Sequence, residues 1–163
     1  MADDSNEDEV IVAETGLGRY QLEARAGRNA IFVDEPVAVG GLGTGLNPYK
    51  LLSAALGSCK VMTMRLYAQN KGWKVDGISV SVRHSRANLQ ARDSFQADII
   101  LKGELDESQR ARLVEIAGRC PVHLTLSRGS DVGTSLLPPG ASFGVTATNT
   151  STHAECMEQA CRS

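Results

Sequence analysis

The most constraining feature of this sequence is one long segment, residues 48–71, whose pattern predicts a single buried helix. Asn47 is a favourable N-cap because its side-chain oxygen can accept from a free first-turn amide, and Pro48 suits the first helical position. Lys71 and Gly72 mark the other end, where a cation suits the helix dipole and a glycine can close the chain in a left-handed conformation. Such a helix would be roughly 36 Å long.

Apolar side chains recur along this segment at helical spacing. They include Leu51, Leu52, Ala55, Leu56, Cys59, Met62, Leu66 and Tyr67. A helix that is apolar nearly all round has to be covered on nearly all sides. One small sheet cannot do this, so we expect a second layer, which a second copy of the chain could supply.

The rest of the chain predicts strands on both sides of this helix, and therefore an α+β fold. We expect an antiparallel meander of strands at 10–15, 19–24 and 30–34, and a hairpin of strands at 78–82 and 95–101. The glycine-rich residues 40–45 lack the register of a phosphate loop and are expected to be a flexible connection.

Two further helices and a last strand are expected in the second half of the chain. Asp106 and Gln109 form a capping box for a helix that ends near Gly118. Cys120 and Pro121 begin a short helix over 122–126, and residues 131–137 form a short strand.

Composition limits the domain organisation and the partners. The 163 residues predict one domain over 10–137, a disordered acidic N-terminus over 1–9 and a C-terminal extension over 138–163. A net charge of −2 and 4% aromatic residues argue against nucleic-acid binding, and no apolar run is long enough to span a membrane. The acidic N-terminus differs from a signal peptide, so we expect a cytosolic protein.

Four cysteines carry the candidate chemistry: Cys59, Cys120, Cys156 and Cys161. In a reducing compartment they are expected to be thiols rather than structural disulfides. Cys120 precedes a short helix whose amides at Val122 and His123 could stabilise a thiolate. Cys59 gains nothing from a helix end, so it is either a core residue or a thiol activated by a distant cation.

Two histidine patterns leave alternatives open. His123, three residues after Cys120, either forms a Cys–His nucleophile pair, faces solvent or is a cap partner of the short helix. His153, Cys156 and Cys161 either ligate a metal, for which a fourth ligand is not evident, or belong to an unstructured tail. We expect no metal and no cofactor.

The segment from Asn47 to Cys59, the Lys71-Gly72-Trp73 run and the Cys120-Pro121-Val122-His123 element together resemble the OsmC/Ohr family of thiol-dependent hydroperoxide reductases. The resemblance covers roughly residues 10–137. It implies an intertwined homodimer in which antiparallel sheets wrap around long central helices.

The resemblance also implies roles for particular residues. Cys59 matches the peroxidatic cysteine, and Cys120 matches the resolving cysteine. Arg19 fits the arginine that holds the thiolate, with Arg25 and Arg28 as rival candidates. The implied partners are an organic hydroperoxide and an external dithiol of the lipoyl type, and the substrate pocket is implied at the dimer interface.

One position departs from the family pattern. Tyr49 and Lys50 stand where a glutamate that pairs with the arginine is expected. The alternative to a peroxidase is therefore a dimeric redox-sensing or small-molecule-binding protein with little turnover.

Overall fold

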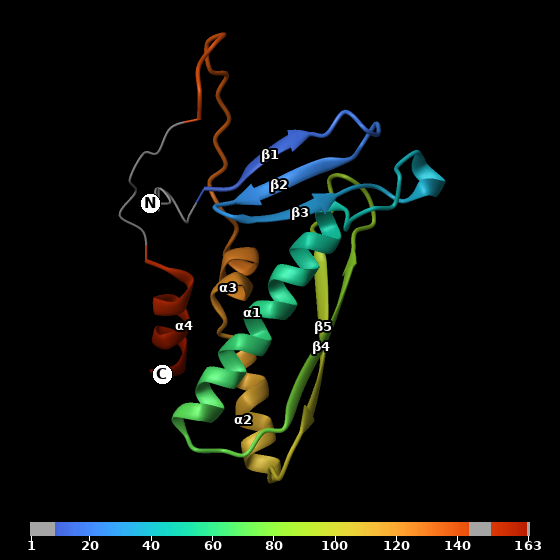
Figure 1. Cartoon of the computed structure of the whole chain (residues 1–163). Coiled ribbons are helices and arrows are strands. Elements are labelled where there is room, and N and C mark those ends of the chain that lie inside the picture. Colours follow the sequence, from blue (N-terminus) through green and yellow to red (C-terminus); the bar gives the residue numbers. More distant parts are fainter. Residues whose placement is uncertain (1–8, 144–150, 163) are drawn as a thin grey trace. The chain divides into compact units, whose positions relative to one another are not determined.

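The computed structural model describes residues 9–143 and 151–162. These residues form two compact units, one from the described parts of 1–51 and 133–149 and the other from 52–132 and 150–163. Each unit is described by itself. Figure 1 shows the elements in chain order. Apart from Glu9, the predicted disordered N-terminus lies outside the described residues.

The first unit contains the predicted antiparallel meander. Strands β1 (Ile11–Glu14), β2 (Leu22–Ala26) and β3 (Asn29–Val33) form one sheet in the order β1-β2-β3 (Figure 1). The second strand begins later than predicted because residues 16–20 bend before the chain pairs, and the Thr15 amide donates to the Gln21 carbonyl at 3.2 Å. Arg19 therefore precedes β2 rather than lying on it.

This sheet exposes apolar side chains on both of its faces. Val12 and Ile11 are neighbours on β1, Ile31 and Phe32 are neighbours on β3, and all four are exposed. Because adjacent residues of a strand point to opposite faces, neither face of the sheet is fully covered in the single chain.

Residues 40–45 are held by hydrogen bonds, so the prediction of a flexible connection is wrong. After the short 3-10 helix η1 (Val37–Val39), the buried Asp34 carboxylate accepts from the Leu42 amide at 3.0 Å and the Thr44 amide at 3.2 Å. Burial alone would raise the pKa of Asp34, but these bonds and those from the Thr44 hydroxyl and the Glu35 amide lower it.

Helix α1 (Pro48–Asn70) confirms the predicted long helix and runs from the first unit into the second. The Asn47 side chain accepts from the Lys50 amide at 3.0 Å, as expected of an N-cap, and Gly72 has a φ of 66°. In the described part of the chain, the buried residues of α1 lie on one side of the helix. Leu52 and Met62 remain 42% and 51% exposed, which leaves apolar surface for a second layer.

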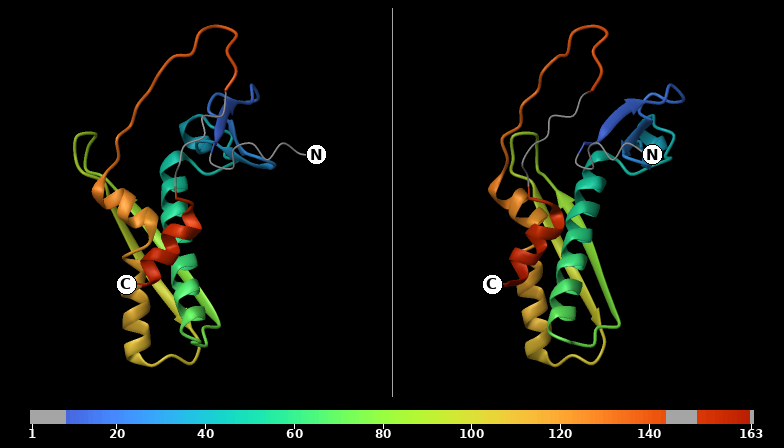
Figure 2. Two further views of the ribbon diagram at one scale, coloured as in Figure 1. Left: turned by 90° about the vertical axis from the view of Figure 1, so that its left-hand side faces the viewer. Right: turned by 60° about the vertical axis from the view of Figure 1, so that its left-hand side comes forward.

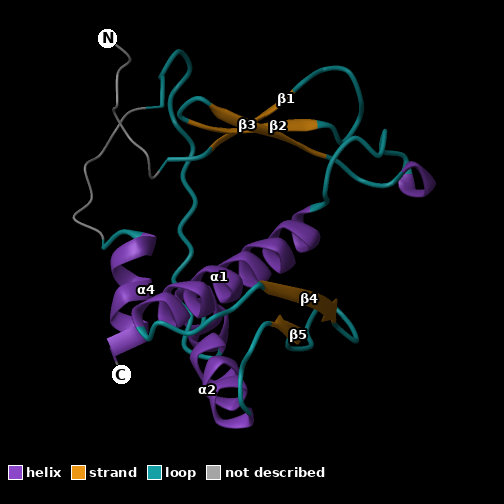
Figure 3. Ribbon diagram, turned by 60° about the horizontal axis from the view of Figure 1, so that its bottom comes forward, coloured by secondary structure: helices purple, strands orange, loops and turns teal. Residues whose placement is uncertain are grey.

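The second unit has a core between two helices and a hairpin. Strands β4 (Gly77–Ser85) and β5 (Ser94–Lys102) pair antiparallel and alternate between half-buried and exposed residues, as predicted. Their inward side chains meet α1 and α2 (Glu107–Ala117), and Figure 3 shows these elements together. Met64 from α1 and Leu113 and Ile116 from α2 are fully buried at the centre.

Both predicted helix starts in the second half of the chain are confirmed. Asp106 and Gln109 form the reciprocal capping box of α2. Cys120 is the N-cap of α3 (Pro121–Arg128), with Pro121 at the first helical position, and α3 extends beyond the predicted residues 122–126. The capping residues therefore position Cys120 at the junction between α2 and α3.

The C-terminal predictions are wrong in two places. Residues 131–137 form no strand, because they pair with neither of the two sheets. The tail over 153–162 is not unstructured but forms α4 (His153–Arg162), which lies next to α3 (Figure 2). Within the described residues, none of the helices combines the length and hydropathy needed to cross a bilayer.

Candidate thiol site

The fold brings Cys59 and Cys120 together within the second unit. Cys59 lies on α1 with 2% of its surface exposed, and Cys120 is fully buried at the start of α3. Together with Leu56 they form a small buried cluster, against which Val82 of β4 and Phe95 of β5 pack. Cys59 is thus not merely a filler of the main core, because its sulfur faces the second thiol.

Three donors converge on the Cys59 sulfur. The Cys120 thiol donates to it, the Val122 amide lies 3.4 Å away, and Nε2 of His153 lies 3.2 Å away. A thiolate is an acceptor only, so a sulfur surrounded by donors is stabilised in its charged form.

These hydrogen bonds separate the acidities of the two thiols. The bond from Cys120, helped by those from His153 and Val122, lowers the pKa of Cys59 well below that of an ordinary thiol, although burial opposes this. Donation to Cys59, together with burial, raises the pKa of Cys120. Both shifts favour the negative charge on Cys59 and the proton on Cys120.

One of the two α3 amides acts as expected and the other does not. The His123 amide donates to Cys120, as predicted, and this bond favours the charged form of that thiol. The Val122 amide was expected to stabilise a Cys120 thiolate, but it donates to Cys59 instead. The free amide at the start of α3 thus favours the charged form of the thiol that lies in the middle of α1.

Lys60 is a buried cation that the sequence analysis did not select. Its side chain is 5% exposed, and its Nζ donates to the Ala117 carbonyl at 2.8 Å and to Nδ1 of His123 at 3.1 Å. Burial lowers the pKa of Lys60, while negative charge on Cys120 or Cys59 raises it. A lysine within an otherwise apolar helical stripe was the signal that could have found it.

The His123 ring is not placed as a base for Cys120. Because an ammonium group only donates, Nδ1 of His123 accepts from Lys60. Burial and the nearby Lys60 charge lower the pKa of His123. The Cys–His nucleophile hypothesis is therefore not supported, since Cys120 gains a backbone hydrogen bond from His123 and no contact with its ring is found among the described residues.

The residues of the H-x2-C-x4-C pattern do not converge on one point. His153 contacts Cys59, whereas the Cys161 thiol donates to the Thr63 carbonyl at 3.6 Å. Across residues 9–143 and 151–162, no three potential ligands of the His, Cys, Asp or Glu type gather in a way that could hold a metal ion.

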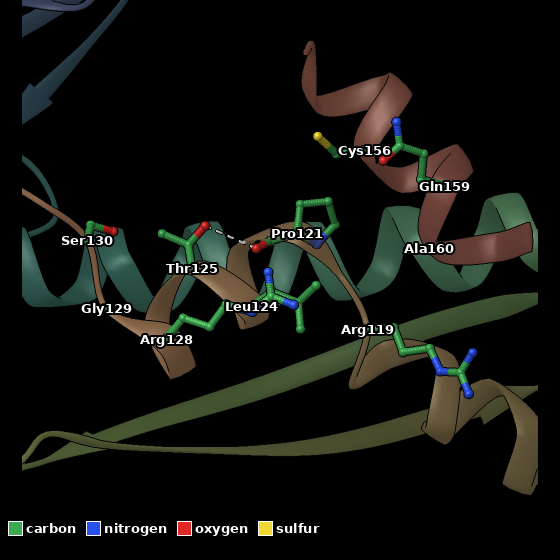
Figure 4. A pocket seen from close by; sticks show the side chains of 10 residues that line it. All are labelled: Arg119, Pro121, Leu124, Thr125, Arg128, Gly129, Ser130, Cys156, Gln159 and Ala160. Atoms are coloured by element: carbon green, nitrogen blue, oxygen red, sulfur yellow. Dashed lines mark hydrogen bonds between the residues drawn. The ribbon is translucent and has the colours of Figure 1, made fainter. Parts of the chain in front are cut away.

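A pocket of about 720 Å³ lies between α3 and α4. Cys156, Gln159 and Ala160 of α4 line it on one side and are labelled in Figure 4. The α3 side and its flanks contribute Arg119, Pro121, Leu124, Thr125, Arg128, Gly129 and Ser130. Neither Cys59 nor Cys120 lines this pocket, so it is separate from the paired thiols.

Comparison with known proteins identifies the family. The family model for OsmC-like protein matches residues 41–135, which is more than half of the chain and includes Cys59 and Cys120. The chain belongs to the OsmC-like protein family. The resemblance found in the sequence is thereby confirmed. No curated protein matches the chain.

Solved OsmC-like structures have the same α+β architecture. An osmotic stress induced and detoxification response protein from Psychrobacter arcticus 273-4 is 25% identical, with a TM-score of 0.63 over 71% of this chain and 85% of that chain. An OsmC like protein from Mycoplasma pneumoniae is 19% identical, with a TM-score of 0.58 over 78% and 89% of the two chains. An organic hydroperoxide resistance protein OsmC from Legionella pneumophila is 20% identical, with a TM-score of 0.55 over 72% and 88%.

Arg19, the arginine that was expected to hold the thiolate, belongs to the first unit, whereas Cys59 belongs to the second. The Arg19 guanidinium lies 5.1 Å from the centre of the Tyr20 ring, and Arg25 pairs with Glu23 at 2.6 Å. The role of Arg19 at Cys59 therefore stays a prediction.

A carboxylate lies close to the start of α1 although Tyr49 and Lys50 replace the expected glutamate. Nδ2 of Asn47 donates to a Glu35 oxygen at 3.4 Å, and all of these residues belong to the first unit. Glu35 was not selected from the sequence, because it precedes the helix by a loop and no motif marks it.

Proposed function

We propose that this OsmC-like protein is a thiol-dependent peroxidase that reduces organic hydroperoxides to alcohols. The observation that carries the proposal is the convergence of the Cys120 thiol, the Val122 amide and His153 on the Cys59 sulfur. A thiolate is the nucleophilic form of cysteine, and this environment favours it. An organic hydroperoxide resistance protein among the similar structures supports the same substrate class.

In the first step, the Cys59 thiolate attacks the terminal oxygen of the hydroperoxide. A sulfur–oxygen bond forms, the oxygen–oxygen bond breaks, and the alkoxide leaves and takes up a proton. Cys59 is oxidised to the sulfenic acid, and the peroxide is reduced to the alcohol.

In the second step, Cys120 resolves the sulfenic acid. The Cys120 sulfur attacks the Cys59 sulfur, a disulfide forms, and the hydroxyl group leaves as water with the thiol proton. Contact between the two residues in one buried cluster supports this step, because a disulfide needs Cα atoms about 4.4 to 6.8 Å apart. An external dithiol, such as a lipoyl group, then reduces the disulfide by thiol exchange.

The proposal includes an obligate homodimer. The exposed apolar side chains on both faces of β1–β3 and the exposed Leu52 and Met62 of α1 are surfaces that a second copy could cover. We expect the interface to bury more than about 2,000 Å² in total, the range of obligate pairs. The substrate pocket would then lie at this interface, beside α1.

Two cations would favour the thiolate. Lys60 lies near Cys59 and Cys120 within one unit, and its charge interacts with both thiols. Arg19 would add a second charge, as the resemblance implies, and Glu35 is a candidate for the missing carboxylate partner.

Peroxide consumption tests the function directly. The purified protein is mixed with cumene hydroperoxide, with and without dihydrolipoamide, and residual peroxide is measured. We expect catalytic turnover with the dithiol and consumption of about one equivalent per chain without it. Oxidation of the thiols without turnover in the presence of several dithiols would favour a redox-sensing protein instead.

A further inference from the structure

Helix α4 lies outside the segment that the family model matches, residues 41–135, and yet it reaches the peroxidatic cysteine. A capping box fixes the start of this helix. The Glu155 carboxylate accepts from the Thr152 amide at 2.7 Å, and the Glu155 amide donates to the Thr152 hydroxyl at 3.2 Å. His153 is thereby held as the first residue of α4.

A second contact holds the other end of α4. Cys161 donates to the Thr63 carbonyl and packs against the core of the second unit. Thr63 lies about one helical turn after Cys59 on α1. Two ends of α4 thus contact the same stretch of α1, so the position of His153 beside Cys59 does not depend on a single hydrogen bond.

Among the described residues around the Cys59 sulfur, His153 alone suits the release of a proton in the first step. The Val122 amide is not an acid, and Cys120 needs its own proton until the resolving step. The Lys60 ammonium donates to Ala117 and His123 instead. His153 is exposed, so solvent can restore its proton after each reaction.

We propose that His153 is a catalytic residue, the general acid that protonates the departing alkoxide when Cys59 attacks the hydroperoxide. This inference rests on the proposed peroxidase function. In the step, the imidazolium of His153 gives its Nε2 proton to the alkoxide oxygen as the oxygen–oxygen bond breaks. The products are the Cys59 sulfenic acid, the alcohol and neutral His153.

A general acid at this position would accelerate the reaction because of the chemistry of the leaving group. An alkoxide is strongly basic and leaves poorly, and a positioned general acid typically contributes about 10²–10⁴-fold to the rate. A carboxylate, which leaves when a peracid is attacked, is weakly basic and needs no proton. Iodide, which leaves during alkylation by iodoacetamide, needs none either.

The substitution His153→Gln separates proton donation from hydrogen bonding. Glutamine keeps an N–H donor but cannot act as an acid near neutral pH. We expect oxidation of Cys59 by cumene hydroperoxide to slow by about 100-fold. Oxidation by peracetic acid and alkylation by iodoacetamide should change by less than about threefold, because the thiolate is still present and no acid is needed.

His84→Gln is the matched control, because His84 lies on β4 and pairs with Asp93 at 2.6 Å. It should leave all three rates at the wild-type value. Equal slowing of all three reactions by His153→Gln would show that His153 only stabilises the thiolate, and no slowing at all would show that it does nothing; either result overturns the inference. A wild-type protein that is alkylated but consumes neither oxidant would overturn the proposed function itself, and the inference with it.

Discussion

Cys59 and Cys120 are buried and share a hydrogen bond. Cys156 and Cys161, in contrast, lie half-buried on α4 and contact different parts of the protein. Cys156 faces the pocket between α3 and α4, and Cys161 donates to a backbone carbonyl of α1. Hydrogen-bond donors, including the Cys120 thiol, surround the Cys59 sulfur and lower its pKa. Burial instead raises the pKa of Cys161.

This contrast shows which properties make a cysteine a candidate for redox chemistry. Exposure alone would have favoured the α4 cysteines, which are the more accessible pair. Convergence of donors and a second thiol in contact favour Cys59 instead. The predictions below test whether this difference in surroundings becomes a difference in function.

The largest effect is expected at Cys59. Cys59→Ser should abolish peroxide consumption, because serine provides no thiolate to attack the peroxide. Residual peroxide after incubation with cumene hydroperoxide and dihydrolipoamide is the measurement. Sustained consumption by this variant would move the nucleophile to another cysteine.

Substitution of Cys120 should stop turnover without preventing the first reaction. Cys120→Ser is expected to consume about one equivalent of peroxide and then stall, because the sulfenic acid cannot form the disulfide. Cys120→Ala should in addition shift the alkylation of Cys59 to higher pH, since alanine lacks the donor that lowers the pKa of Cys59. Full turnover by Cys120→Ser would contradict the resolving role.

Lys60 tests the electrostatic part of the comparison. Lys60→Gln keeps a donor for Ala117 and His123 but removes the charge near both thiols. Loss of a nearby cation raises a thiol pKa by on the order of one unit. At pH values below the pKa of Cys59, the thiolate fraction and therefore the alkylation rate should fall by about tenfold. The rate of iodoacetamide labelling as a function of pH measures this shift. An unchanged profile would assign the stabilisation to hydrogen bonds alone.

Arg19 tests whether the first unit contributes to the site. Arg19→Ala should raise the pKa of Cys59 by up to about one unit and slow its alkylation near neutral pH, if the charge reaches the thiolate in the assembled protein. Arg25→Ala is the control, because Arg25 pairs with Glu23. Equal effects of the two substitutions would leave Arg19 without a specific role.

The smallest effect is expected on α4. The double substitution of Cys156 and Cys161 by serine should leave peroxide turnover unchanged. Neither sulfur contacts Cys59 among the contacts described, and the hydroxyl that Cys161→Ser introduces can still donate to the Thr63 carbonyl. Peroxide consumption with the dithiol is again the measurement. A loss of turnover would show that a thiol of α4 takes part in resolution.

Much of the fold could be predicted from local signals. The Asn47–Pro48 start of α1, the alternation along β4 and β5 and the capping box at Asp106 each act within a few residues, and each is confirmed. The helix α4 carried an equally local signal, the Thr152 and Glu155 capping box, which the Ser- and Thr-rich surroundings obscured.

Less of the candidate site could be predicted from the sequence, because its geometry depends on contacts between residues that are far apart in the chain. Cys59 was selected through a family resemblance, whereas Cys120 also had a local electrostatic argument, the free amides at the start of its helix. The approach of Lys60 to His123 and of His153 to Cys59 joins residues that are far apart in the chain. No local pattern predicts such pairs, since the packing of α1 against α3 and α4 creates them.

The most direct test of the account is the chemical state of Cys59 after a single reaction. Cys120→Ser is treated with one equivalent of cumene hydroperoxide, trapped with dimedone and analysed by peptide mass spectrometry. The account predicts that dimedone labels Cys59 and leaves Cys156 and Cys161 unmodified. Labelling of either α4 cysteine with Cys59 still reduced would contradict the central claim.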